Sequence, residues 1–130
     1  MAAAVPLSPA SAEPAFYFYK PAVERQAFEA DLGQCIELAG GVSVHANAPY
    51  AANPYAAAAG AFFAGMMASR ERRAMIGSVM RTCMADKGYR RVVAPKPVVK
   101  ELGSLKDQDK MARLFDLASQ ASPLGEVLPR

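Results

Sequence analysis

Residues 83–89 read Cys-Met-Ala-Asp-Lys-Gly-Tyr, and they contain one of the two cysteines in the chain. The other cysteine, Cys35, lies four positions after Asp31 and four before Ala39, so the three residues share one face of a helix. If Cys35 and Cys83 form a disulfide, the chain is a cross-linked helical domain that folds outside the cytosol. Closing a loop of that length would stabilise the fold by roughly 4 kcal/mol.

Other states of the two cysteines stay open at this point. They could be reduced, buried thiols of a cytosolic protein, or a redox pair. The chain has no Cys-x-x-Cys spacing, which is typical of rapidly exchanging dithiols, so we favour a structural disulfide. Two cysteines and one histidine, His45, are too few ligands for a structural metal site. No nucleophile with a base and an orienting group is visible, and we expect neither a cofactor nor a catalytic residue.

The spacing of apolar residues predicts a short amphipathic helix near each end of the chain. The first spans about 21–39, because Pro21 suits the first helical position and Gly40 follows the last apolar residue. The other spans about 105–120. Residues 90–94, which precede a proline, are expected to be extended.

A long helix is predicted over about 54–87. Asn53 supplies its N-cap and is followed by a proline at the first helical position. At the other end, Gly88 supplies the left-handed residue beyond the helix, and Tyr89 supplies the hydrophobic contact that often follows it. We therefore expect Gly88 and Tyr89 to cap the C-terminus of this helix.

These elements predict an all-α fold: a small helical hairpin or three-helix arrangement with one long central helix, a disordered N-terminus and one disulfide. A single helical domain would span 15–120, followed by a C-terminal tail at 121–130. Residues 1–14 are mostly Ala, Pro and Ser, a composition that cannot form a packed core. They are either a disordered tail or, as we favour, the remnant of a secretory signal peptide, because the run 10–12 has small-x-small spacing.

A disulfide between Cys35 and Cys83 would constrain this arrangement. Cys35 lies near the end of its helix, whereas Cys83 lies roughly 44 Å along the long one at 1.5 Å per residue. Bonded cysteines need Cα atoms within about 7 Å of each other. Either the segment 40–53 runs back along the long helix, or that helix breaks near 69–73. We favour the intact helix, because Arg-Glu-Arg-Arg at 70–73 is a good helix former.

The first half of the long helix is uncharged and rich in small residues. Small residues at intervals of four allow another helix to approach the backbone closely. We expect the face they form to be packed; its members are Ala56, Gly60, Ala64, Gly65 and Ala68. The charged turn that follows must face water, a headgroup layer or a partner, so Arg70, Arg72 and Arg73 are candidate contacts to an acidic partner or an anionic lipid headgroup.

The net charge of +3 is unevenly distributed, with the basic excess between residues 70 and 100. The basic excess by itself does not predict nucleic-acid binding, because no fold signature or interleaved aromatic residue accompanies the basic residues. Residues 38–69 carry no charge, but prolines and asparagines shorten their helical part below the ~20 residues that a bilayer requires. Five methionines between 66 and 84 are expected in the core rather than in a partner groove. Arg81 is a candidate ion-pair partner of Asp31.

Taken together, Asp-x3-Cys-x3-Ala, the Ala/Gly-rich stretch and Arg-x-Cys-Met-x2-Lys-Gly-Tyr resemble small secreted envelope proteins of Gram-negative bacteria of the glycine-zipper or lipoprotein-like type. The similarity covers about residues 28–92. It implies that Cys35 and Cys83 are disulfide partners, that Gly60 and Gly65 belong to the zipper, and that Lys87-Gly88-Tyr89 ends the helix. It also implies a location in the periplasm or outer envelope.

The sequence therefore predicts a non-enzymatic, secreted envelope protein with a structural or protein-interaction role through its small-residue helix face. Its partner would be another envelope protein or a second copy of itself. The first alternative is a membrane-inserted or membrane-associated glycine-zipper element, with an anionic membrane surface as partner. The second is a basic nucleic-acid-binding domain.

Overall fold

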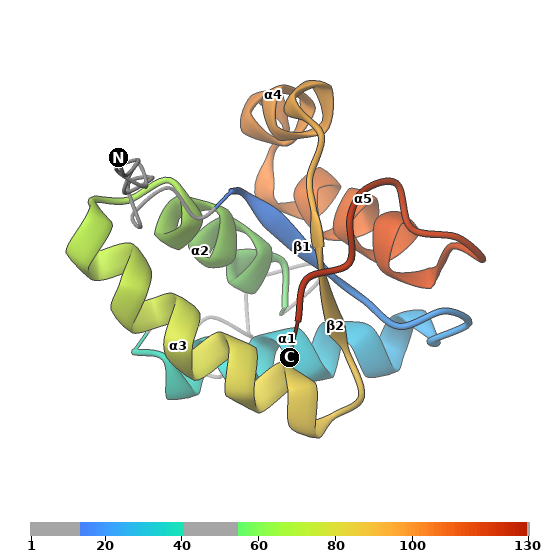
Figure 1. The fold of residues 1–130 in the computed structure, drawn as a ribbon, viewed down its shortest axis with the longest axis horizontal. Helices are drawn as coiled ribbons and strands as arrows, with labels where there is room; N and C mark the ends of the chain where they lie inside the picture. The colour runs from blue at the N-terminus through green and yellow to red at the C-terminus, as the bar shows by residue number, and fades with distance from the viewer. Residues whose placement is uncertain (1–13, 41–54, 130) are drawn as a thin grey trace, which may run out of the picture.

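The computed structural model describes residues 14–40 and 55–129. Within these two stretches the chain forms five helices and two strands, as Figure 1 shows. Their order is β1 (Phe16–Tyr19), α1 (Arg25–Leu38), α2 (Ala56–Met66), α3 (Arg70–Asp86), β2 (Arg90–Val93), α4 (Lys96–Ser104) and α5 (Asp107–Ser119). The fold is mostly helical, and the expectation of an all-α hairpin or three-helix arrangement is corrected by the sheet and by the additional helices.

The two strands pair antiparallel, with Phe16 opposite Val93. All four residues of β1 are buried, so the strand is covered on both faces. A strand that is buried on both faces shows no alternation of polar and apolar residues, and periodicity cannot reveal it. Its run of aromatic side chains was the available signal, since aromatic residues favour strands.

The C-terminal segment lies along the other edge of β2. The amide of Val93 donates to the carbonyl of Glu126 (2.8 Å), and the amide of Leu128 donates to the carbonyl of Arg91 (2.8 Å). The expected tail at 121–130 is thus held against the sheet as far as it is described. Gly125 permits this close approach, because a Cβ atom there would lie 2.2 Å from the carbonyl oxygen of Val93.

The predicted first helix begins later than expected. The chain turns at Pro21, and α1 starts only at Arg25, because the amides of Lys20 and Ala22 bond to the carbonyls of Ala118 and Ser119. The helix expected at 105–120 is confirmed as α5. The extended segment at 90–94 is confirmed as β2, whereas α4 was not predicted.

The intact long helix is wrong, and the alternative, a break near residues 69–73, is observed. Helix α2 ends at Met66, and Ser69 is extended (ψ 159°) before α3 begins at Arg70. Tertiary packing overrides the helix propensity of the charged turn here, because α3 must turn back to reach α1. Ser69 belongs to a favoured N-cap type and is followed by Glu71 in the first turn of α3, which was the local signal for a helix start. The expected Asn53 cap and the returning segment lie outside the described residues.

Cys35 and Cys83, 48 positions apart in the sequence, form a disulfide that joins α1 to α3, with Cα atoms 5.7 Å apart. Cys35 is completely buried, and Cys83 is partly exposed. The predicted pairing is confirmed.

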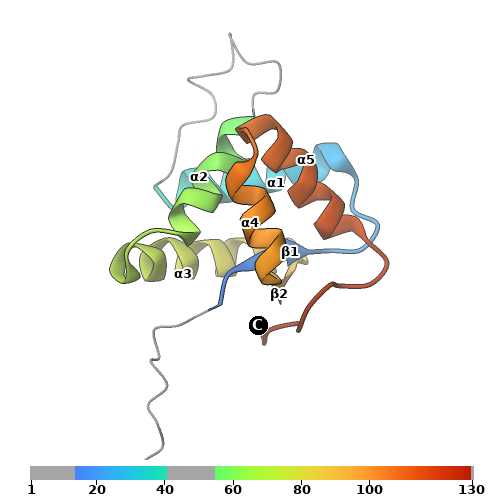
Figure 2. The ribbon, with the colours of Figure 1, turned by 90° about the horizontal axis from the view of Figure 1, so that it is seen from above.

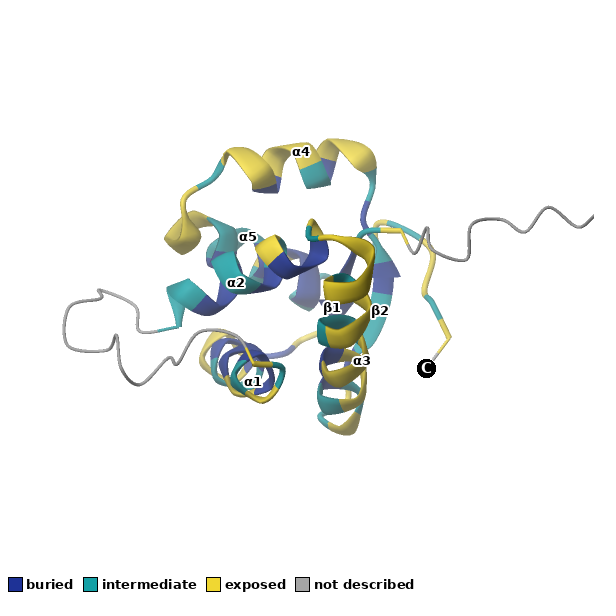
Figure 3. Cartoon of the chain, turned by 90° about the vertical axis from the view of Figure 1, so that its left-hand side faces the viewer, coloured by how far each residue is buried: buried dark blue, intermediate teal, exposed yellow. Residues whose placement is uncertain are grey.

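The core lies where β1 and α2 meet α5. At one end of the core three aromatic rings pack together, and the ring centroids of Phe16, Phe18 and Phe62 are 5.4–6.0 Å apart. The methionines divide between two environments. Met66, Met80 and Met84 are buried, as expected for core residues, whereas Met67 and Met75 are exposed. Figure 3 shows this contrast on α3, which carries a buried face and a broad exposed one.

The C-terminus of α3 has the expected cap. Gly88 adopts a left-handed conformation (φ +95°), its amide donates to the Ala85 carbonyl, and the Tyr89 amide donates to the Met84 carbonyl. These two bonds define a Schellman motif. Tyr89 is buried directly after it.

We predict that replacing both cysteines by alanine lowers the free energy of unfolding by about 2–4 kcal/mol, because the unfolded chain loses its cross-link. Urea denaturation followed by circular dichroism measures this loss. Reduced wild-type protein is the control and should lose a similar amount. Equal stability of the oxidised wild type and the double variant would contradict a structural role for the bond.

Candidate interaction surface

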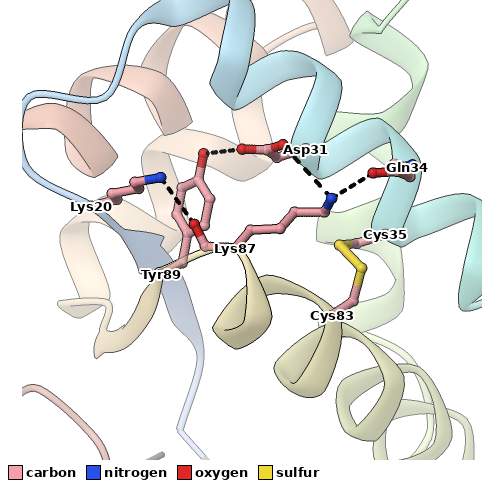
Figure 4. Close-up of polar contacts among 7 residues, drawn as sticks. All are labelled: Lys20, Asp31, Gln34, Cys35, Cys83, Lys87 and Tyr89. Atoms are coloured by element: carbon pink, nitrogen blue, oxygen red, sulfur yellow. Dashed lines mark hydrogen bonds and ion pairs between the residues drawn. A yellow bond between two sulfur atoms is a disulfide. The ribbon is translucent and has the colours of Figure 1, made fainter.

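The two sequence motifs meet at the contact between α1 and α3, beside the disulfide (Figure 4). The Tyr89 hydroxyl donates to an Asp31 carboxylate oxygen at 2.9 Å. The Lys87 ammonium donates to the Gln34 side-chain oxygen at 2.5 Å and lies 3.9 Å from Asp31. Lys20 closes the group from the end of β1, because its ammonium donates to the Lys87 carbonyl at 2.9 Å.

This cluster joins α1 to the C-terminal end of α3 and to the end of β1. Asp31 faces a phenol and an ammonium, so the expected pairing with Arg81 is wrong; Arg81 is exposed on α3. Burial, together with the hydrogen bond to Asp31 and the Asp31 charge, raises the pKa of the Tyr89 phenol well above its usual value of 10.0. A phenol held neutral beside a carboxylate is a hydrogen-bond donor and a poor nucleophile. The motif residues therefore serve to dock α3 on α1.

The small-residue face of α2 is divided between buried and exposed positions. Gly65 is buried, and a Cβ atom there would lie 3.2 Å from the Ile76 side chain of α3. A Cβ atom on Gly60 would overlap the Asp107 carboxylate of α5. Ala64 is exposed, however, so the expectation that this whole column is packed is wrong at Ala64. Ala56 and Ala68 are half-buried.

A groove of about 420 Å³ explains the exposure of Ala64. It lies between the end of α1 and the junction of α2 with α3; we call it the α2 groove. Its lining consists of small and apolar residues with one cation: Ile36, Ala39, Gly40, Ala61, Ala64, Gly65, Ala68, Ile76 and Arg72. The groove thus brings small residues of α2 together with one of the predicted arginines.

The three predicted arginines have different surroundings. Arg70 and Arg72 are exposed at the start of α3. Arg73 is half-buried, and its guanidinium lies 3.5 Å from the Met66 carbonyl across the break between α2 and α3. Arg73 therefore stabilises the junction, which leaves Arg70 and Arg72 as the accessible cations of this region.

A second groove, of about 690 Å³, lies on the opposite side of the disulfide; we call it the α3 groove. Leu38, which lines this groove, is 67% exposed, and Met75, one turn before Val79 on α3, is 71% exposed. Its lining is Gln34, Leu38, Ser78, Val79, Thr82, Cys83, Asp86 and Lys87. Most of the large exposed apolar side chains in the described part of the chain thus belong to α1, the α2–α3 junction or α3; they are Leu38, Met67, Met75 and Val79.

Neither a metal centre nor a membrane-spanning helix is found in the described residues. Groups of three or more His, Cys, Asp and Glu side chains that could hold a metal do not occur there. Within residues 14–40 and 55–129, every helix is too short or too polar to cross a bilayer.

The first prediction from this geometry concerns Tyr89. Its raised pKa means that the folded state holds the phenol neutral. The contribution of this phenol to the free energy of unfolding is therefore fully present below the unfolded pKa of about 10 and is lost as the pH rises further. Tyr89→Phe should reduce this alkaline loss, as measured by urea denaturation between pH 8 and pH 11. At neutral pH the same variant should lose about 1.5–3 kcal/mol, the contribution of a hydrogen bond to a charged group. An unchanged alkaline slope would contradict the assignment.

A second prediction uses two adjacent residues of α2. Gly65→Leu should clash with Ile76 and cost about 1–3 kcal/mol by overpacking, partly offset by the better helix propensity of leucine. Ala64→Leu is the matched control and should change the free energy of unfolding by less than about 0.5 kcal/mol, because the residue is exposed. Thermal denaturation of both variants checks the difference. Equal destabilisation would show that the two positions are packed alike.

Comparison with known proteins identifies no family for this chain. No family model matches the chain, and neither the curated proteins nor the solved structures contain a significant match.

Proposed function

We propose that the chain is a non-enzymatic, secreted protein of the Gram-negative cell envelope that binds another protein through the α2 groove. The observation that carries the proposal is the groove itself, in which Ala64 and Ala68 leave room beside Arg72. A groove with a small-residue wall accepts an apolar helix or extended segment at short distance. An arginine at its rim favours a segment that carries a carboxylate, because the guanidinium can form two parallel hydrogen bonds with it.

The disulfide supports the envelope location. Disulfides persist in oxidising compartments such as the periplasm and are rare in the cytosol. The residues that carry the resemblance to small envelope proteins also contact one another, since Asp31 bonds to Tyr89 and Cys35 to Cys83. These contacts join α1 to the C-terminal end of α3, which is a physical reason for the residues to occur together as a motif.

The basic excess gives little support to nucleic-acid binding. The Arg90 guanidinium donates to the Leu128 carbonyl at 3.1 Å, and that of Arg91 donates to the Pro129 carbonyl at 3.0 Å. Lys87 is engaged with Gln34. These cations hold the chain together, whereas nucleic-acid binding needs a continuous accessible basic surface.

Site-specific photo-crosslinking in the source cells tests the proposal. A photo-reactive phenylalanine analogue at Ala64 should crosslink to a second protein, and the double variant Arg70→Glu/Arg72→Glu in the same background should remove at least about nine-tenths of the product, as loss of a charge-assisted contact predicts. The same analogue at Lys100, exposed on α4, is the control and should give no such product. No crosslink at Ala64, or an equal one at Lys100, would overturn the proposal. A crosslink to lipid instead of protein would favour the membrane-associated alternative.

A further inference from the structure

Three residues on α3 form a line along its exposed face. Arg72, Val79 and Asp86 follow one another at intervals of seven, close to two turns of an α-helix, so the line drifts by only about 20° per interval. All three are exposed, and an apolar residue thus lies midway between two opposite charges.

Neither charge is satisfied within the described chain. The ion pairs among the described residues do not include Arg72 or Asp86. Fourteen residues of helix hold the two about 21 Å apart, well beyond the screening length of about 8 Å at physiological ionic strength. Each charge also stands at the end of α3 that disfavours it, since the helix dipole prefers anions at the N-terminus and cations at the C-terminus.

We propose that the exposed face of α3 pairs with the same face of a second copy, antiparallel and related by a two-fold axis through Val79. Such an axis places the residue seven positions before Val79 opposite the residue seven positions after it. Arg72 of each copy then meets Asp86 of the other, and both pairs form at once. Two-fold interfaces are self-complementary in this way, because residue i contacts j and j contacts i.

The α3 groove provides the shape that this pairing needs. The same axis sets Met75 of one copy opposite residue 83 of the other, and Cys83 lines the α3 groove together with Val79 and Thr82. Met75 is 71% exposed and is unbranched and adaptable, so it can enter the groove of the second copy. Leu38, which is 67% exposed beside the groove, adds apolar area at the same contact.

The charges favour a second copy over an acidic partner. A uniformly acidic helix laid along this line would meet Arg72 favourably but would be repelled by Asp86. A parallel arrangement of two copies would place like charges together. Of these three arrangements, only the antiparallel pair satisfies both ends, which is how charge patterns select partner and orientation. This self-association uses the α3 groove and shares only Arg72 with the proposed binding of another protein in the α2 groove.

A charge-swap experiment on the full oxidised chain tests the pairing. Sedimentation velocity over a range of concentrations should show a monomer–dimer equilibrium for the wild type. Arg72→Asp and Asp86→Arg should each weaken dimerisation at least about tenfold, because either change turns both attractive pairs into repulsive ones. The double variant Arg72→Asp/Asp86→Arg restores opposite charges and should dimerise within about threefold of the wild type.

Arg81→Asp is the matched control, since Arg81 is equally exposed but lies nine residues from Arg72, on the opposite side of α3. It should leave the dimerisation constant within about threefold. Circular dichroism and intact mass confirm that each variant is folded and oxidised. A wild type that stays monomeric at the highest concentration, or a double variant as weak as the single ones, would overturn the proposal. Asp86→Arg should leave the photo-crosslink at Ala64 unchanged, so loss of self-association is distinguishable from failure of the α2 groove to bind.

Discussion

The contact between α1 and α3, fixed by the Cys35–Cys83 bond, is the constraint on which the rest of the structure depends. It requires α3 to turn back on α2, and the chain meets this requirement by breaking its helix between Met66 and Arg70. Because α3 turns back, Ile76 packs against Gly65, and a side chain at position 65 would crowd Ile76. Figure 2 shows α3 beside α1 and α2 from above. A single cross-link thus explains a break next to a segment of high helix propensity.

The same contact creates both grooves. Along α1, Gln34 and Leu38 lie one turn apart on one side, whereas Ile36 and Ala39 lie on the other, and the bonded Cys35 stands between the two sets. The first set lines the α3 groove, and the second lines the α2 groove. Because a rigid cross-link separates them, the two grooves have a fixed relation to each other.

How much of this was predictable depended on whether the signal was local. The cap at Gly88 and Tyr89 and the helix α5 follow from rules that act within a few residues, and both were predicted correctly. The strand β1 was missed because its two faces are buried by elements that lie far away in the sequence. The small-residue column of α2 had the right composition, but exposure of Ala64 depends on where α3 turns back, and the sequence alone does not indicate that.

At the candidate site, too, the fold decides which of the cations in the sequence remain accessible. The sequence groups nine cations between residues 70 and 100, yet three of them bond within the fold: Lys87 to the Gln34 side chain, and Arg90 and Arg91 to carbonyls of the C-terminal segment. Arg73 is likewise used at the helix break. The cations left at the start of α3 are those beside which small and apolar side chains lie exposed. A guanidinium next to an apolar groove recognises a carboxylate on an apolar segment better than a bare charged surface does. The position of these arginines, more than the net charge of +3, is therefore the basis of the proposed binding to another protein.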